Sequence, residues 1–176
     1  MEINLRNRLA VVTGGSGQLG RVICRTLADC GANLVVHYYN NQSMAESVCD
    51  EVKQGGKRSM AVQADVTDQA SIARMKIQIE ERLGEPDIIV NNAVIQYSWL
   101  NVLDQDLADY ESQYRSCILH NVLMAQAFVP AMMKKQWGRV IAINTECSMQ
   151  NFPTQSAYVA GKRGMDGVLR VLAKEI

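Results

Sequence analysis

The sequence lacks several features that mark metal-binding, nucleic-acid-binding and membrane proteins. Only two histidines occur among its 176 residues, and the five cysteines have no CxxC or other ligand spacing, so we expect buried structural thiols and no metal site. Eighteen basic residues balance eighteen acidic ones without a basic run, which disfavours nucleic acid as a partner. The N-terminus has no hydrophobic signal segment, and no apolar run approaches the roughly 18 residues of a membrane span. We therefore expect a cytoplasmic protein that binds small molecules.

Short apolar runs alternate with longer helical patterns along the chain. The expected strands are residues 9–14, 33–38, 59–65, 86–93 and 138–145, and the expected helices are residues 19–28, a helix opened by a capping box at Ser43, and residues 68–83, 110–135 and 158–175. No hairpin dipeptide separates the strands. Continuous apolar strands joined by helices are typical of a parallel sheet covered on both faces. The sequence predicts an α/β fold with one doubly wound parallel sheet, in a single domain over residues 1–176.

Each expected strand is followed by a polar or glycine-rich segment, and ligands of doubly wound sheets bind at that edge. The first segment, TGGSGQLG, has glycines at positions 14, 17 and 20 between a strand and a helix. Such glycines allow a tight turn and a close approach of the backbone to a pyrophosphate, which meets the free amides of the helix. This loop predicts a nucleotide-binding site.

Tyr158 and Lys162 lie four residues apart, so both side chains project from one face of the last helix. A free phenol has a pKa of about 10, and a nearby ammonium group favours the phenolate and lowers that value. The pair is therefore suited to general acid and base catalysis. An isolated pair of this kind is more often a half-buried tyrosine beside a solvated lysine, but the glycine loop upstream favours the catalytic interpretation.

Taken in order, TGGSGQLG, NNA, Asn121 and YVAGK after GRVIAINT resemble the short-chain dehydrogenase/reductase family, including its 3-oxoacyl-ACP reductase-like members. The resemblance implies a Rossmann fold and an NAD(P)-dependent oxidoreductase that transfers a hydride between nicotinamide and a carbonyl or alcohol substrate. Gln18 and Val94 stand where the family usually has glycine. The spacing of the glycines at positions 14, 17 and 20 is instead similar to that of the family's longer members.

The resemblance also implies roles for individual residues. Tyr158 is the general acid and base, Lys162 lowers its pKa and binds the nicotinamide ribose, and Thr145, where the family usually has serine, binds the substrate oxygen. Asn121 holds a water that leads to the lysine, unless its amide bonds to its own helix. The expected cofactor-binding residues are Gly14, Gly17, Gln18, Leu19, Gly20, Tyr38, Asn40, Asp65, Val66, Asn92, Ala93, Tyr158 and Lys162.

The second strand ends at Tyr38, where an acidic residue would select NAD(H) by binding the ribose 2′-hydroxyl. Without that acid we expect NADP(H) rather than NAD(H), although no Arg or Lys lies between Arg25 and Lys53 to pair with a 2′-phosphate. A solvated loop is the alternative explanation of these polar residues. Asp65, placed at the adenine by the resemblance, could equally be a helix cap.

The last expected helix runs to the end of the sequence at Ile176 with no glycine stop and no following strand, whereas the resemblance implies further strands and a substrate lid. We expect a fragment of a longer dehydrogenase; the alternatives are a catalytically inactive short form that binds nucleotide or acts as a scaffold, and a structural module without cofactor. Gly161, Gly164 and Gly167 recur every three residues and allow close backbone approach to the sheet or to another helix. With the long helix before them they resemble the family's dimer-forming pair, which implies a homodimer or homotetramer.

Overall fold

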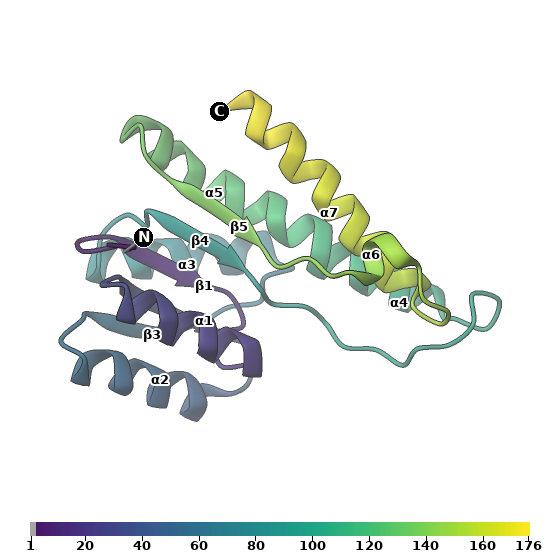
Figure 1. Cartoon of the computed structure of the whole chain (residues 1–176), viewed down its shortest axis with the longest axis horizontal. Coiled ribbons are helices and arrows are strands. Elements are labelled where there is room, and N and C mark those ends of the chain that lie inside the picture. Colours follow the sequence, from purple (N-terminus) through teal and green to yellow (C-terminus); the bar gives the residue numbers. More distant parts are fainter. Residues whose placement is uncertain (1–2) are drawn as a thin grey trace.

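Five parallel strands form one sheet in the computed structural model, which describes residues 3–176 (Figure 1). The strands are β1 (Leu9–Val12), β2 (Asn33–Tyr38), β3 (Ser59–Gln63), β4 (Ile88–Asn91) and β5 (Arg139–Ala142), in the spatial order β3-β2-β1-β4-β5. The helices are α1 (Gln18–Asp29), α2 (Gln42–Gln54), α3 (Gln69–Arg82), α4 (Leu107–Gln113), the π-helix η1 (Tyr114–Leu119), α5 (His120–Lys134), α6 (Cys147–Gln150) and α7 (Ser156–Glu175). The predicted doubly wound parallel sheet is confirmed.

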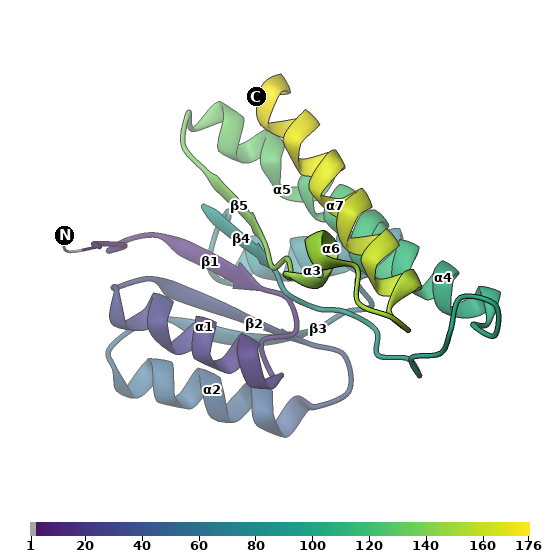
Figure 2. The same ribbon diagram turned by 45° about the vertical axis from the view of Figure 1, so that its right-hand side comes forward.

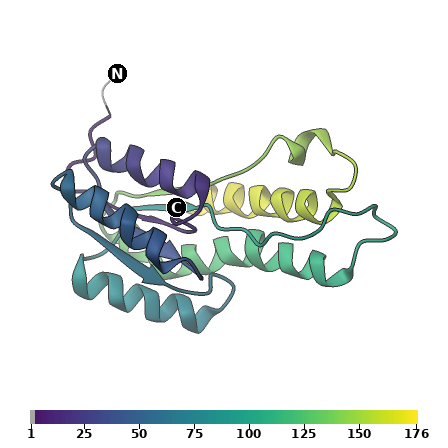
Figure 3. The same ribbon diagram turned by 90° about the horizontal axis from the view of Figure 1, so that it is seen from below.

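Helices cover both faces of the sheet, as Figures 2 and 3 show. Alternate strand residues point to opposite faces. Val11, Val35 and Ile89 join the core layer under α3 and α5, whereas the intervening residues Val12 and Val36 join the layer under α1 and α2. Burial on both faces explains why the strands are continuous apolar runs in the sequence. Of the five cysteines, Cys24, Cys49 and Cys117 are buried, as predicted, and Cys30 and Cys147 are half-buried.

The helix boundaries differ from the predicted ones at two caps. Asn41, not Ser43, caps α2, because the Asn41 side chain accepts a hydrogen bond from the Met44 amide at 3.2 Å and Ser43 lies inside the first turn. The predicted capping box is therefore wrong. The long helix begins at Leu107 rather than at 110, because the Asp106 carboxylate accepts the Ala108 amide at 2.9 Å. The short helix α6 was not predicted.

Leu107–Lys134 forms one continuous helix, which is long and apolar enough to cross a membrane by length and composition alone. Half of its most apolar window is buried inside the protein. Leu123, Met124 and Phe128 from this helix belong to the core layer under α3 and α5. Core helices have the same composition, and we assign this one to the core.

The glycines of α7 pack within the chain. A Cβ atom on Gly161 would lie 3.0 Å from the Gln113 carbonyl oxygen, and one on Gly164 would lie 2.3 Å from the Ile118 side chain. Around Gly167, by contrast, residues 3–176 place nothing within 4 Å of such an atom. The close approach predicted from the glycine spacing is therefore made to η1 and the end of α4, by two of the three glycines.

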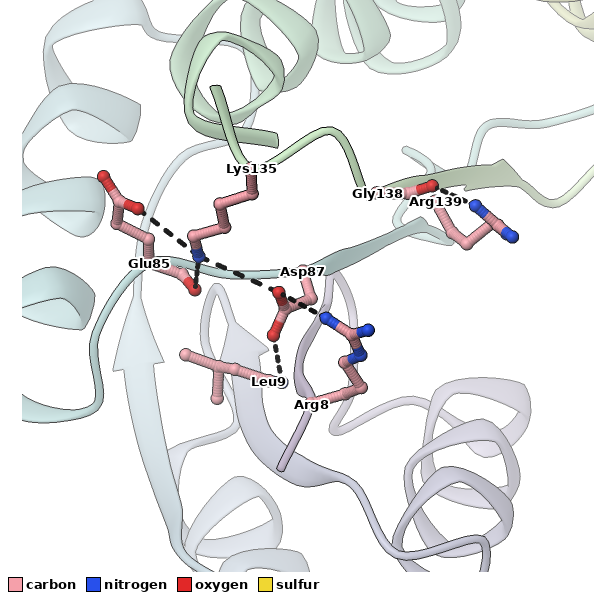
Figure 4. Close-up of polar contacts among 7 residues, drawn as sticks. All are labelled: Arg8, Leu9, Glu85, Asp87, Lys135, Gly138 and Arg139. Atoms are coloured by element: carbon pink, nitrogen blue, oxygen red, sulfur yellow. Dashed lines mark hydrogen bonds and ion pairs between the residues drawn. The ribbon is translucent and has the colours of Figure 1, made fainter. Parts of the chain in front are cut away.

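A charged cluster joins the amino ends of β1 and β4 to the end of α5 (Figure 4). The buried Asp87 carboxylate accepts the Leu9 amide at 3.0 Å and the Arg8 guanidinium at 3.4 Å, and Lys135 Nζ lies 3.8 Å from it. Arg8 also stacks over the Trp137 ring, with 3.6 Å between the guanidinium carbon and the ring centre. Asp87 thus fixes the edge of the sheet opposite the polar segments.

We predict that Asp87→Ala lowers the free energy of unfolding by about 2–3 kcal/mol, because the buried Leu9 amide and the cations lose their acceptor. Urea denaturation measures the change. Asp50→Ala is the matched control, since Asp50 pairs with Lys53 on the exposed face of α2 and its loss is expected to cost less than about 0.5 kcal/mol. Equal losses in the two variants would contradict this role of Asp87.

Candidate active site

A cleft of about 580 Å³ lies over the carboxyl ends of the strands. Because parallel strands all end at the same edge, the loops after β1, β2, β3 and β4 and the start of α7 meet there. The predicted residues that line it are Gly14, Gly17, Gln18, Leu19, Gly20, Asn40, Asp65, Val66, Asn92, Ala93, Tyr158 and Lys162. The sequence therefore located the cleft from several distant segments, while Tyr38, Thr145 and Asn121 do not line it.

At Gly14 and Gly20, the two ends of the glycine loop, there is no room for a side chain. Gly14 has a φ of +62°, in the left-handed region that favours glycine, and a Cβ atom on it would lie 3.1 Å from the Asn92 side chain. A Cβ atom on Gly20 would lie 2.1 Å from the Gly14 carbonyl oxygen. Gly17 precedes α1, which begins at Gln18, so the first amides of α1 have no side-chain cap from that residue. Such a loop fits a phosphate group.

Thr13 and Asn92 join the glycine loop to the end of β4. The Thr13 hydroxyl oxygen accepts the amides of Asn92 at 2.9 Å and Ala93 at 3.1 Å. In return, the Asn92 side chain donates to the carbonyl oxygen of Thr13 at 3.0 Å. Neighbouring strand ends are thereby held together at the point where the order of the strands reverses.

His37 extends this connection to β2 and β3, and sequence reasoning missed its role. The Gly14 amide donates to His37 Nδ1 at 2.9 Å, so Nε2 carries the proton and donates to the Ala64 carbonyl at 3.0 Å. Burial lowers the pKa of His37 to about 4, with the Ala64 hydrogen bond opposing the change. The signal available in the sequence was a histidine near the end of an apolar strand, just before a polar segment.

Tyr38 was predicted to contact the cofactor, and this placement is wrong. Its ring is 8% exposed and packs with Leu34 and Val36 in the core layer under α1 and α2. Tyr39, the next residue, is 58% exposed and lines the cleft. The prediction is off by one position, and in a strand a shift of one residue moves the side chain to the other face of the sheet.

Asp65 forms a local turn rather than capping a helix. Its carboxylate accepts the Thr67 amide at 2.8 Å and the Thr67 hydroxyl at 2.7 Å, whereas Asp68 caps α3. This turn presents residues 65–67 to the cleft. Among the described residues that line the cleft, Asp65 is the single acidic one.

Tyr158 and Lys162 project into the cleft from α7, with 5.6 Å between Lys162 Nζ and the centre of the tyrosine ring. Lys162 is buried and donates to the Ile143 carbonyl at 2.5 Å, which brings the end of β5 into the site. Burial lowers the pKa of Lys162, and the neighbouring Cys117 thiol opposes this.

The pKa of the Tyr158 phenol is raised, not lowered as the sequence predicted. Burial is the main cause, Cys117 and Cys147 add to it, and a hydrogen bond with the Thr145 hydroxyl opposes it. The Lys162 ammonium, whose Nζ lies 5.6 Å from the ring centre, does not outweigh this loss of solvation. Thr145 thus lies near the phenol, although it does not line the cleft, and its role in binding the substrate oxygen stays a prediction.

Asn121 is fully buried on α5, one helical turn after Cys117. Its amide nitrogen donates to the Cys117 carbonyl of its own helix at 2.7 Å, and its oxygen accepts the Asn91 amide at 2.7 Å. The bond to its own helix, the alternative to a water-holding role, is therefore present. Cys117, from the π-helical turn η1, is the residue that comes near Tyr158 and Lys162, and the sequence pattern did not single it out.

Residues 8–176 match the family described as short chain dehydrogenase. D-beta-hydroxybutyrate dehydrogenase of Rhizobium meliloti (strain 1021) is 34% identical over 177 residues, covering 96% of this chain and 66% of that protein. 3-Oxoacyl-(acyl-carrier-protein) reductase FabG of Staphylococcus epidermidis (strain ATCC 35984) is 31% identical over 180 residues, covering 97% of this chain and 69% of that protein. The chain thus spans about two thirds of the length of these curated relatives.

A solved structure of similar fold is that of 7 alpha-hydroxysteroid dehydrogenase complexed with NADH and 7-oxo glycochenodeoxycholic acid. Its TM-score is 0.92 at 25% sequence identity, and the match covers 99% of this chain and 67% of that one.

The two buried histidines predict a pH dependence of stability. Burial lowers the pKa of His37 to about 4 and that of His120 to about 3, so between pH 6.5 and 4 the unfolded chain binds protons that the folded chain does not. Stability therefore falls as pH falls, by about 1.4 kcal/mol per pH unit for each histidine. Urea denaturation from pH 7 to 4.5 should show a slope shallower by about that amount in His120→Gln. An unchanged slope in the variant would contradict the burial of a neutral His120.

Proposed function

Because the chain belongs to the short-chain dehydrogenase family, we propose that it transfers a hydride between a nicotinamide dinucleotide and a carbonyl or alcohol carbon, with Tyr158 as general acid and base. One observation supports this most: Tyr158 and Lys162 line the same cleft as the glycine loop, although Tyr158 lies 144 positions after Gly14 in the sequence. A cofactor-binding loop and a proton-transferring pair meet there at one site.

The residues of the cleft suit a dinucleotide. The loop from Gly14 to Gly20 and the first amides of α1 would hold the pyrophosphate, and the turn at Asp65 and Val66 would lie beside the adenine. Asn92 and Ala93 also line the cleft, and Lys162 would contact the nicotinamide ribose. The bound cofactor supplies or accepts the hydride.

The raised pKa of Tyr158 favours the direction of reduction. At neutral pH the phenol keeps its proton, so it can donate that proton to the oxygen of a carbonyl as the charge on the oxygen develops. Thr145, beside the phenol, would donate a second hydrogen bond to the same oxygen. Oxidation of an alcohol requires the phenolate and is therefore expected to need alkaline pH.

We propose NADP(H) as the preferred cofactor. The loop after β2 presents Tyr39, Asn40 and Asn41 to the cleft, and none of these residues carries a charge that would repel a 2′-phosphate. The substrate is proposed to be a small carbonyl or alcohol compound, and the whole protein is proposed to be a cytoplasmic homodimer or homotetramer. The exposed faces of α5 and α7 would provide the contact between subunits.

Tyr39→Asp is expected to reverse the cofactor preference, because a carboxylate at this position repels a 2′-phosphate and accepts a ribose hydroxyl. The ratio of the NADH to the NADPH dissociation constant should fall by about ten-fold or more, measured by nicotinamide fluorescence. Gln54→Asp, at the far end of α2, adds the same charge and should leave the ratio unchanged. Tighter binding of NADH than NADPH to the unaltered chain would contradict the proposed preference.

Tyr158→Phe is expected to lower carbonyl reduction by about 100-fold or more, because the ring stays and its proton is lost. In the unaltered chain the reduction rate should be level through neutral pH and fall at alkaline pH, as the phenol ionises. Tyr114→Phe, an exposed tyrosine of η1, is the control and should keep full activity.

Full turnover in Tyr158→Phe would contradict the proposed role. If the unaltered chain binds NADPH but oxidises it with no member of a panel of carbonyl compounds, the catalytically inactive, nucleotide-binding alternative would be supported instead.

A further inference from the structure

The first turn of α7, which carries Tyr158, is not capped by the residue before it. The first amides of a helix have no partner within the helix, and a side chain at the preceding residue usually accepts one of them. Gln155 precedes α7, and within residues 3–176 its side chain makes no such bond. Its backbone, with φ of −110° and ψ of 22°, lies outside the extended conformation that brings a capping side chain to the third amide.

Tyr97 supplies the missing acceptor from a distant segment. The Tyr158 amide, third in the helix, donates to the phenolic oxygen of Tyr97 at 2.8 Å. Tyr97 lies between β4 and α4, directly after residues 92–96, which line the cleft. A bond to the backbone of Tyr158 therefore connects this lining segment to the proposed acid.

The segment that carries Tyr97 is itself held in place. Gln113, at the end of α4, is fully buried, and its side-chain nitrogen donates to the Ile95 carbonyl at 2.8 Å. The carbonyl oxygen of Gln113 lies 3.0 Å from where a Cβ atom of Gly161 would be. The end of α4 thus contacts both the segment before Tyr97 and the α7 turn after Tyr158.

We propose that Tyr97 is a positioning residue for the reaction proposed above: its hydroxyl oxygen fixes the first turn of α7 so that the Tyr158 phenol faces the cleft. This inference rests on the proposed function. Tyr97 does not line the cleft, so it acts through Tyr158 and not on the substrate.

The packing of α7 confines the effect of Tyr97 to the turn that carries Tyr158. Gly161 and Gly164 press the body of the helix against the end of α4 and η1, so that part keeps its place without Tyr97. Ahead of Gly161, the bond to Tyr97 orients the turn. Small displacements of a reacting group lower rates strongly, so loss of this bond should affect turnover more than cofactor binding.

Tyr97→Phe tests the proposal against a matched control. Tyr110 also bonds to the first turn of α7, through its hydroxyl and the Ser156 side chain at 2.7 Å, so Tyr110→Phe removes an equivalent phenol without touching the Tyr158 amide. We expect Tyr97→Phe to lower kcat about ten-fold and to change the NADPH dissociation constant less than about two-fold. Tyr110→Phe should keep kcat within about two-fold. Equal losses of kcat in both variants, or none in Tyr97→Phe, would overturn the proposal.

Amide hydrogen exchange tests the same bond without relying on activity or on a variant that folds. In the unaltered chain the Tyr158 amide should exchange more slowly than the Ala157 amide, which precedes it in the same turn. Exchange of Tyr158 as fast as that of Ala157 would overturn the proposal. If the unaltered chain reduces no carbonyl compound, the proposed function fails, and the exchange measurement alone then decides whether Tyr97 holds Tyr158.

Discussion

The hydrogen bonds around Gly14 hold the cleft together. The amide of Gly14 is fixed by His37, and the carbonyl oxygens of Thr13 and Gly14 are reached by the Asn92 side chain, at 3.0 and 3.3 Å. His37 in turn reaches Ala64 beyond β3. Four neighbouring strands therefore end in one bonded unit, and a left-handed glycine sits at its centre. A loop held in this way can present its backbone to a phosphate without first becoming ordered, which lowers the cost of binding.

Desolvation governs the charges in the site. Burial raises the pKa of Tyr158 and lowers those of Lys162 and His37, so each group is shifted toward its neutral form. The carbonyl of Ile143 takes the Lys162 ammonium as a hydrogen-bond donor and fixes it beneath the tyrosine ring. A protonated phenol next to a bound hydride donor is suited to reducing a carbonyl. The electrostatics of the cleft thus agree with the proposed direction of the reaction.

Much of the fold could be predicted from the sequence. Burial of strands and helix faces produces continuous apolar runs and helical spacing, and both patterns can be read within a short stretch of the chain. The glycine loop and the Tyr158–Lys162 pair were located for the same reason, since each depends on close spacing in the sequence. The errors concern the directions of side chains. Tyr38 follows Leu34 and Val36 into the core by strand alternation, so the exposed residue is Tyr39.

Contacts between distant segments could not be predicted from one sequence. The π-helical turn η1 brings Cys117 to the pair and leaves Asn121 bonded to Asn91, and no local pattern marks that change of helical phase. Likewise, His37 gains its role only because β1 lies between β2 and β4, and Tyr97 because the segment after β4 passes the start of α7. These are consequences of topology, which the spacing of residues does not reveal.

The most direct test of the account is to map, by backbone amide chemical shifts, where NADPH binds to the whole chain. The account predicts shifts concentrated at the glycine loop, at the turn after β3, at Asn92 and Ala93, and at the start of α7 near Tyr158. Shifts confined to the apolar groove between α5, β5 and α7, around Val129 and Leu172, would contradict it, as would the absence of any shift at saturating cofactor.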